Sequence, residues 1–153
     1  VGSEMCIRDR LFMDYRNAAD CSDLHTIIYG HNMRVKSMFG SLHDFESEDF
    51  YKKHNKIYLY QPGKTIKCTI YSVYDCLDKS ATYNTDFSDD GNDNKWVDWL
   101  TMTVNNNAYY PIKKKPAEKD HIITLSTCSG KQKGDSYRFV VHSLVTDTVI
   151  YEE

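Results

Sequence analysis

Three residue types in this sequence could together carry out nucleophilic catalysis: a cysteine, an arginine and a histidine, each beside a strand-like segment. Cys128 ends the segment IITLSTC, and Arg138 lies ten positions later, beyond a polar loop. His31 directly follows the apolar segment HTIIYG. A cysteine nucleophile needs a thiolate, a proton carrier, and a positive or hydrogen-donating group where the oxyanion forms. These three residues would supply the three roles.

Residue types and spacing alone do not make this pattern specific. Any chain of 153 residues contains some cysteine, histidine and arginine. The alternative is a buried structural cysteine, with the histidine and the arginine on the surface. On residue types alone, that alternative is the favoured interpretation.

The elements that would position these residues read mainly as strands. The clearest strand is 65–75, where Ile66, Cys68 and Ile70 alternate with polar residues. The segment 24–31 is short, apolar and rich in β-branched residues, and it ends at a Gly-His pair. The other segments expected to form strands are 56–60, 121–128, 136–144 and 147–152.

Two helices are expected between these strands. The segment 46–54 has acidic residues in its first turn and basic residues in its last, which matches the helix dipole. In 95–104, Trp96, Trp99 and Leu100 recur at helical spacing, so this segment reads as an amphipathic helix whose tryptophans are core anchors. Short strands with long irregular connections and few small helices indicate a mixed β-barrel.

Composition narrows the class of protein. The length suits one domain with a sizeable core. A net charge of -3 gives no general attraction to nucleic acid, and the basic run 113–115 reads as a solvated loop. The cysteines form no C-x-x-C pair and the acidic loop 88–95 lacks a full calcium-loop pattern, so no metal or organic cofactor is expected.

The first ten residues, VGSEMCIRDR, stand apart from the rest. They resemble a translated sequencing-adapter tract and lack the apolar region of a signal peptide. We therefore expect 1–10 to be a non-native segment, and the natural N-terminus to be missing.

Eight segments together resemble class B sortases, the cysteine transpeptidases of Gram-positive bacteria. In order from Leu11 to His142, they are FMDYRN, TIIYGHNM, SMFGSL, DFYKKH, IYLY, WVDWL, IITLSTCS and RFVVH. A T-L-x-T-C element followed by an arginine ten residues later is the signature of the family. Y-G-H-N-M is the class B form of its histidine motif.

The resemblance implies a mainly β fold: a closed barrel of about eight strands with a few short helices, including one in the long loop before the last strands. Residues 11–153 would be the catalytic domain, without the family's N-terminal helices and first strand. The catalytic cysteine of the family carries over to Cys128, its histidine to His31 and its arginine to Arg138. Ser129 stands where related enzymes can have an acidic residue, so no acid is needed there.

The activity implied is transpeptidation at the cell surface. Cys128 would cleave the sorting motif of a secreted protein after threonine, and the acyl group would pass to the amine of a lipid-linked peptidoglycan precursor. The protein would sit on the extracellular face of the plasma membrane, through an N-terminal anchor that is missing here. The alternatives are a cysteine protease that uses water as acceptor, and a catalytically silent barrel that only binds wall components.

Residues near the expected catalytic group are candidates for substrate binding. Ser126 and Thr127 precede the nucleophile and are either groove residues or simple strand residues. Tyr109 and Tyr110 follow the second helix and could form one wall of the groove. Asn32 flanks the histidine, and orienting the rim is favoured for it over contact with substrate.

Overall fold

The computed structural model describes residues 4–6, 11–13, 16–17, 23–30, 42, 44–61, 63–77, 79–87, 95–128 and 137–150. The strands in this part of the chain are β1 (Glu4–Cys6), β2 (Leu11–Met13), β3 (His25–Gly30), β4 (Lys56–Gln61), β5 (Lys64–Leu77), β6 (Ile122–Cys128) and β7 (Tyr137–Ile150). The helices are α1 (Glu48–Lys53), the 3₁₀ turn η2 (Ala81–Tyr83) and α2 (Lys95–Asn105). None of the described helices is long and apolar enough to cross a membrane.

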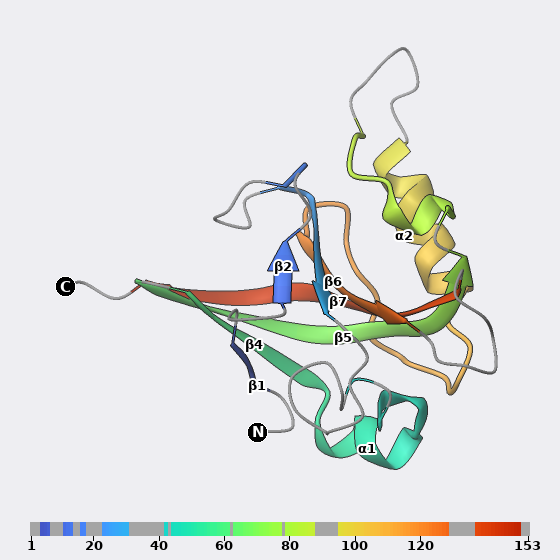
Figure 1. Cartoon of the computed structure of the whole chain (residues 1–153), viewed down its shortest axis with the longest axis horizontal. Coiled ribbons are helices and arrows are strands. Elements are labelled where there is room, and N and C mark those ends of the chain that lie inside the picture. Colours follow the sequence, from blue (N-terminus) through green and yellow to red (C-terminus); the bar gives the residue numbers. More distant parts are fainter. Residues whose placement is uncertain are drawn as a thin grey trace.

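All seven described strands belong to one curled sheet with the order β1-β4-β5-β7-β6-β3-β2 (Figure 1). The prediction of a mainly β fold with few helices is confirmed. A closed barrel would need its two edge strands to pair. Here β1 pairs with β4 and β2 pairs with β3, so the described strands form a half-barrel. β1 lies in the segment 1–10, whose adapter origin stays a prediction.

The two last strands expected from the sequence are one strand in the structure. β7 runs without interruption from Tyr137 to Ile150 beside β5. The register advances from the pair Cys68–Val145 to the pair Lys67–Asp147, so Thr146 is an extra residue in β7. Such a bulge bends a strand without ending it, which is why the polar residues at 146–148 do not form a turn.

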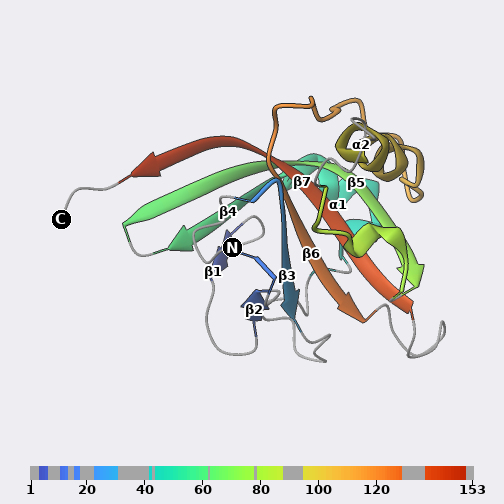
Figure 2. The same cartoon turned by 90° about the horizontal axis from the view of Figure 1, so that it is seen from above.

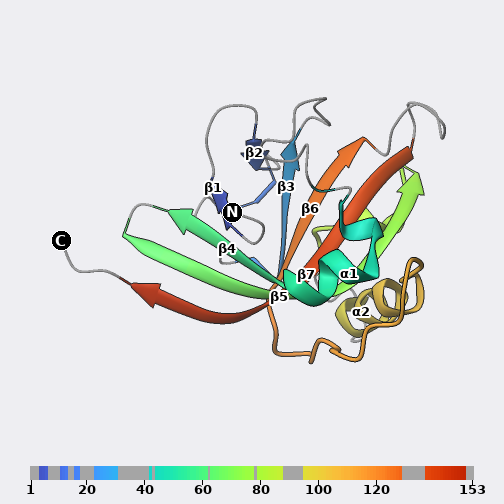
Figure 3. The same ribbon diagram turned by 90° about the horizontal axis from the view of Figure 1, so that it is seen from below.

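Two hydrophobic cores lie on opposite faces of the sheet. On one face, Ile66, Cys68 and Ile70 of β5 join residues of β6 and β7, and Phe50 and Tyr51 of α1 pack against them. On the other face, the α2 residues Trp96, Trp99 and Leu100 pack against β5, β6 and β7. Both predicted patterns of buried residues are confirmed. Figure 1 shows the two helices on opposite sides of the sheet, and Figure 3 shows α1 in front of the central strands.

β5 carries a bulge of its own at Tyr71. The register passes from Ile70–Ser143 to Ser72–His142 and leaves Tyr71 without an opposite residue. As a result two consecutive side chains face α2: the Tyr71 hydroxyl bonds Thr103 Oγ1 at 2.8 Å, and Ser72 Oγ donates to the Thr103 carbonyl at 2.6 Å. The bulge therefore fixes α2 to the middle of the sheet.

Acid should destabilise the fold through His142, which is fully buried in β7. Burial, and then the neighbouring His25, hold the pKa of His142 well below its ordinary value of 6.5. Below that value the unfolded chain binds a proton that the folded chain does not, so stability falls as the pH falls. We expect the free energy of unfolding, measured by urea titration, to fall from pH 7 to pH 5, by at most about 1.4 kcal/mol per pH unit for this histidine.

His142→Gln should be less stable than the unmodified chain at pH 8 but should show a shallower loss on acidification. The control is His121→Gln, which removes a partly buried histidine that bonds the Asp23 carbonyl outside this region. Equal acid slopes in the two variants would contradict the assignment to His142.

Candidate active site

The backbone register brings together Cys128 and Arg138, which are ten positions apart in the sequence. β6 and β7 are antiparallel, and Cys128 lies directly opposite Arg138. Directly opposed residues in such a pair have Cα atoms about 4.5–5.5 Å apart. On its other side Arg138 lies opposite Cys76 of β5. The predicted nucleophile and the predicted arginine are therefore neighbours across one strand pair.

The end of β3 lies at the same rim of the sheet. β3 runs parallel to β6, with Tyr29 paired to Ser126, so Gly30 and Cys128 end neighbouring strands on the same side (Figure 2). The predicted His31 and Asn32 follow Gly30 in the sequence and lie outside the described residues.

A pocket of about 430 Å³ lies beside Arg138, and we call it the Arg138 pocket. The residues that line it are Arg16, Tyr29, Lys79, Ser80, Tyr83, Asn84 and Arg138. Arg138 is half-buried, and its Nη1 donates to the Tyr137 carbonyl at 3.0 Å. Three cationic side chains around one hollow favour ligands rich in carbonyl or carboxylate oxygens.

Tyr83 forms the wall of this pocket next to β6. Its hydroxyl bonds Ser126 Oγ at 2.8 Å, and its ring stacks on Tyr29 with centroids 6.2 Å apart. Arg16 Nη2 donates to the Tyr83 carbonyl at 3.0 Å. Burial raises the pKa of Tyr83 well above its ordinary value, so the hydroxyl keeps its proton. Tyr83 lies in no periodic segment or motif, and no sequence signal singled it out. Arg16 lies in the segment FMDYRN of the family resemblance, but that resemblance did not identify it as a site residue.

The predicted substrate-binding residues divide between the two faces of the sheet. Ser126 faces the Arg138 pocket through Tyr83, although it is itself fully buried. Thr127 alternates to the opposite face, where its buried Oγ1 has no hydrogen-bond partner in the described part of the chain.

Tyr109 and Tyr110 also lie on that opposite face. The Tyr110 hydroxyl donates to the Phe45 carbonyl at 2.5 Å, and the Tyr109 hydroxyl donates to the Asp75 carboxylate. Both rings pack in or against the hydrophobic core on that side of the sheet. These contacts give the two tyrosines a packing role, and their contact with substrate stays a prediction.

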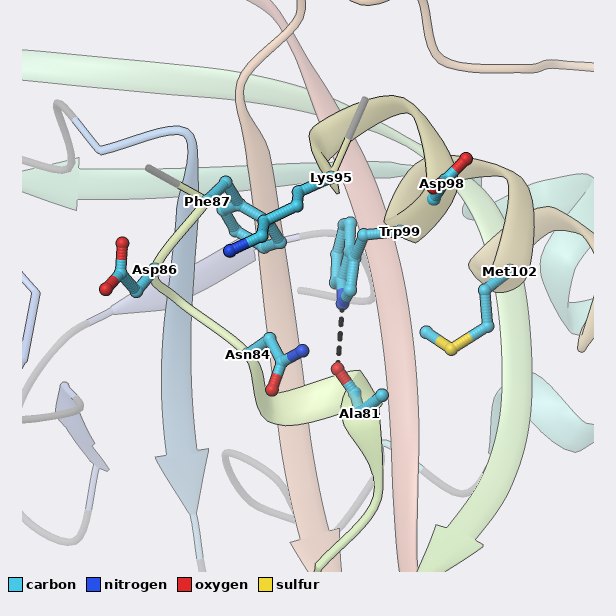
Figure 4. Close-up of a pocket in the computed structure, with 8 residues that line it drawn as sticks. All are labelled: Ala81, Asn84, Asp86, Phe87, Lys95, Asp98, Trp99 and Met102. Atoms are coloured by element: carbon cyan, nitrogen blue, oxygen red, sulfur yellow. Dashed lines mark hydrogen bonds between the residues drawn. The ribbon is translucent and has the colours of Figure 1, made fainter. Parts of the chain in front are cut away.

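A second hollow of about 400 Å³ lies on the other side of Asn84, between η2 and α2 (Figure 4). Phe87, Trp99 and Met102 form its apolar lining, and Trp99 Nε1 donates to the Ala81 carbonyl at 3.0 Å. Among the described residues that line this hollow, none is a predicted catalytic residue. The Arg138 pocket is therefore the candidate site, and the segment 80–84 separates the two hollows.

The two residues that are opposed at this rim are a cysteine and an arginine. A thiolate can attack a carbonyl carbon, and a guanidinium in a fixed position can stabilise the oxyanion that forms. Among the described residues, no group of three histidine, cysteine or acidic side chains could hold a metal ion.

Comparison with known proteins points to one family. A family model described as the Sortase domain matches residues 9–145. Sortase B of Listeria monocytogenes is 35% identical over 138 residues, which are 89% of this chain and 54% of that protein. The solved Staphylococcus aureus sortase B–substrate complex superposes with a TM-score of 0.77 at 29% identity, over 90% of this chain and 62% of that one. A sortase B complexed with triglycine superposes with a TM-score of 0.74 at 28% identity, over 93% of this chain and 63% of that one.

The chain spans about half the length of the curated relative. Within that span, the family match extends from before β2 into β7 and includes Cys128, Arg138 and His31. The fold, the opposed cysteine and arginine, and these matches agree. The chain belongs to the sortase family.

Proposed function

We propose that this chain is the catalytic part of a class B sortase, a cysteine transpeptidase. The observation that carries the proposal is the position of Cys128 directly opposite Arg138, at a rim beside a pocket with three cationic side chains. This arrangement suits attack on a peptide carbonyl whose developing charge is held in place. The family match supports the same chemistry.

In the first half of the reaction, the Cys128 thiolate attacks the carbonyl carbon after the threonine of a sorting motif. Arg138 stabilises the oxyanion of the tetrahedral intermediate. When the C–N bond breaks, protonated His31 gives its proton to the leaving amine, and a thioester remains on Cys128. In the second half, an incoming amine attacks the thioester, His31 takes its proton, and Cys128 leaves as the thiolate.

The substrates we propose are two peptides. The first is the sorting signal of a secreted surface protein, supported by the similarity to a sortase B–substrate complex. The second is an amine of a peptidoglycan precursor, supported by the similarity to a sortase B complexed with triglycine. We further propose that this precursor is lipid-linked, and that the whole protein works on the extracellular face of the plasma membrane, held there by an N-terminal anchor.

The decisive experiment is mass spectrometry of the chain after incubation with a library of candidate sorting peptides, with and without an amine acceptor. An acyl group on Cys128 would identify the motif. Transfer of that group to the amine is the expected result. Release of free acid as the main product even with amine present would indicate a hydrolase, and no adduct at all would contradict the proposal.

Replacing the nucleophile should abolish turnover. We expect Cys128→Ala to form no acyl adduct and to keep the thermal midpoint of the unmodified chain, because the change removes one sulfur atom at a strand end. The matched control is Cys76→Ser, since Cys76 lies opposite Arg138 on the other side. Cys76→Ser should retain acylation. Loss of acylation in this variant alone would identify Cys76 of β5 as the nucleophile instead.

His31→Asn tests the proton carrier. An amide cannot carry the proton, so the rate should fall by roughly 10²–10⁴-fold, the usual contribution of general acid–base catalysis. Peptide binding, measured by fluorescence anisotropy, should be kept. A rate within about threefold of the unmodified chain, which is far smaller than that contribution, would assign this role to another histidine.

Arg138→Lys separates charge from geometry. Lysine keeps the positive charge but presents a compact ammonium in place of a planar fork with five donors. If Arg138 holds the oxyanion in fixed geometry, kcat should fall on the order of 10²–10³-fold. Iodoacetamide labelling of Cys128 should change little, because the charge that favours the thiolate remains. Near-normal turnover would leave Arg138 with an electrostatic role only.

A further inference from the structure

The segment that walls the Arg138 pocket is tied to the sheet at two points, on either side of Tyr83. The Asn84 carbonyl lies 2.7 Å from His25 Nδ1, and the Thr82 hydroxyl lies 2.9 Å from the Tyr74 hydroxyl. Both contacts belong to one continuous series of hydrogen bonds, which we call the buried polar chain. Its members are Asn84, His25, Thr124, His142, Tyr74 and Thr82.

The buried polar chain crosses four strands. From β3, His25 Nε2 lies 2.7 Å from Thr124 Oγ1 of β6. That oxygen lies 2.6 Å from His142 Nδ1 of β7, and His142 Nε2 lies 2.8 Å from the Tyr74 hydroxyl of β5. The buried polar chain thus begins and ends on the same short segment, 82–84. Between these ends it runs through the middle of the sheet. Figure 2 shows β3, β6 and β7 side by side.

The carbonyl at one end fixes the direction of every bond. A carbonyl only accepts, so His25 Nδ1 carries a hydrogen and the Nε2 of a neutral ring accepts from Thr124. Thr124 has one hydrogen, so it must accept from His142 Nδ1. The Nε2 of a neutral His142 then accepts from Tyr74, whose oxygen accepts from Thr82. Each side chain of the series donates once, the Asn84 carbonyl only accepts, and both rings are the Nδ1–H tautomer.

The surroundings keep both rings neutral. His25, Thr124 and His142 are fully buried. The titratable groups that face His142 are His25 from β3 and Tyr71 and Tyr74 from β5, and α2 covers both histidines with the Trp99 ring. A second proton on either ring would turn an acceptor nitrogen into a donor and reverse part of the chain. Burial lowers the pKa of His142 in agreement with this.

We propose that His25 and His142 are positioning residues of the sortase site: through the buried polar chain they hold Thr82 and Asn84 in place and so fix Tyr83 in the wall of the Arg138 pocket. The inference rests on the proposed function, because it assigns the pocket to the peptide substrate. Tyr83 and Asn84 line that pocket, and between the two ends of the chain Tyr83 also bonds Ser126. The segment is thus held at three successive residues.

The direction of the chain is tested on the unmodified protein by long-range ¹H–¹⁵N NMR of the histidine rings at pH 7.5. Both His25 and His142 should show the Nδ1–H tautomer. His121 does not belong to the buried polar chain: its Nδ1 bonds the backbone carbonyl of Asp23. Its ring therefore helps to assign the spectrum. An Nε2–H tautomer or a charged ring at His25 or His142 would overturn the inferred direction.

The positioning role is tested by a matched pair of tyrosine variants. Tyr74 and Tyr71 are both in β5, both 2% exposed, and each bonds a threonine hydroxyl, at 2.9 and 2.8 Å. Only Tyr74 belongs to the buried polar chain. Tyr74→Phe and Tyr71→Phe should both lower the thermal midpoint, Tyr74→Phe by more, because it loses the bonds to His142 and Thr82 whereas Tyr71→Phe loses only the bond to Thr103. Only Tyr74→Phe should raise KM for the sorting peptide, about tenfold, with kcat kept, as expected when the buried hydrogen bond that holds Thr82 is lost.

Thr82 offers a rescue at the other end of the same bond. Thr82→Val should behave as Tyr74→Phe does, whereas Thr82→Ser, which keeps the hydroxyl, should retain the KM of the unmodified chain. An equal change of KM in Tyr71→Phe and Tyr74→Phe, or no change in either, would overturn the positioning role. The buried polar chain would then only stabilise the core.

Hydrogen exchange separates failure of this inference from failure of the proposed function. The Tyr83 and Asn84 amides donate to the Ser80 and Ala81 carbonyls. Both amides should exchange faster in Tyr74→Phe, whereas in Tyr71→Phe they should exchange as in the unmodified chain. This readout does not need an active enzyme. Unchanged exchange in Tyr74→Phe would overturn the inference even if peptide turnover is observed, and faster exchange without turnover would count against the function alone.

Discussion

The antiparallel pairing of β6 with β7 is the constraint on which the site depends. It converts a separation of ten residues in the sequence into two directly opposed positions, Cys128 and Arg138. The same ladder pairs Thr124 with His142, four residues away from that pair on each strand. A shift of this register by one residue would separate Cys128 from Arg138 and break the buried polar chain at its centre. Catalytic geometry and core geometry are therefore fixed by the same hydrogen bonds.

The two faces of the sheet have different characters. The core on the face covered by α1 is mainly apolar, with Ile, Leu, Val and Phe side chains from β4 to β7. The face covered by η2 and α2 mixes Trp99 and Leu144 with buried histidine, threonine and tyrosine groups that are hydrogen-bonded to one another. Apolar packing tolerates small changes in position, whereas a hydrogen-bonded series permits few arrangements. The more specific face is the one that carries the Arg138 pocket.

Much of the architecture could be predicted from the sequence. The alternation in β5 and the helical spacing of Trp96, Trp99 and Leu100 are local signals, and both identified the buried residues correctly. The family motifs placed Cys128 and Arg138 at strand ends, as the structure has them. The prediction of two separate strands, 136–144 and 147–152, was wrong. The polar residues between them were interpreted as a turn, whereas the structure has a bulge within one strand. Tyr83 and the buried histidines could not be found in this way, because their partners are 18 to 99 residues away.

The bulge at Tyr71 has a consequence for how the sequence of β5 can change. Before it, Ile66, Cys68 and Ile70 face the apolar core; after it, Val73 does, so the phase of the strand is shifted by one residue. Only this shifted phase brings Tyr74 to His142 and puts Cys76 opposite Arg138. Between residues 71 and 77, β5 can thus accept substitutions but not the gain or loss of a single residue, which would exchange its two faces. Length variation among related chains should therefore fall outside this stretch of β5.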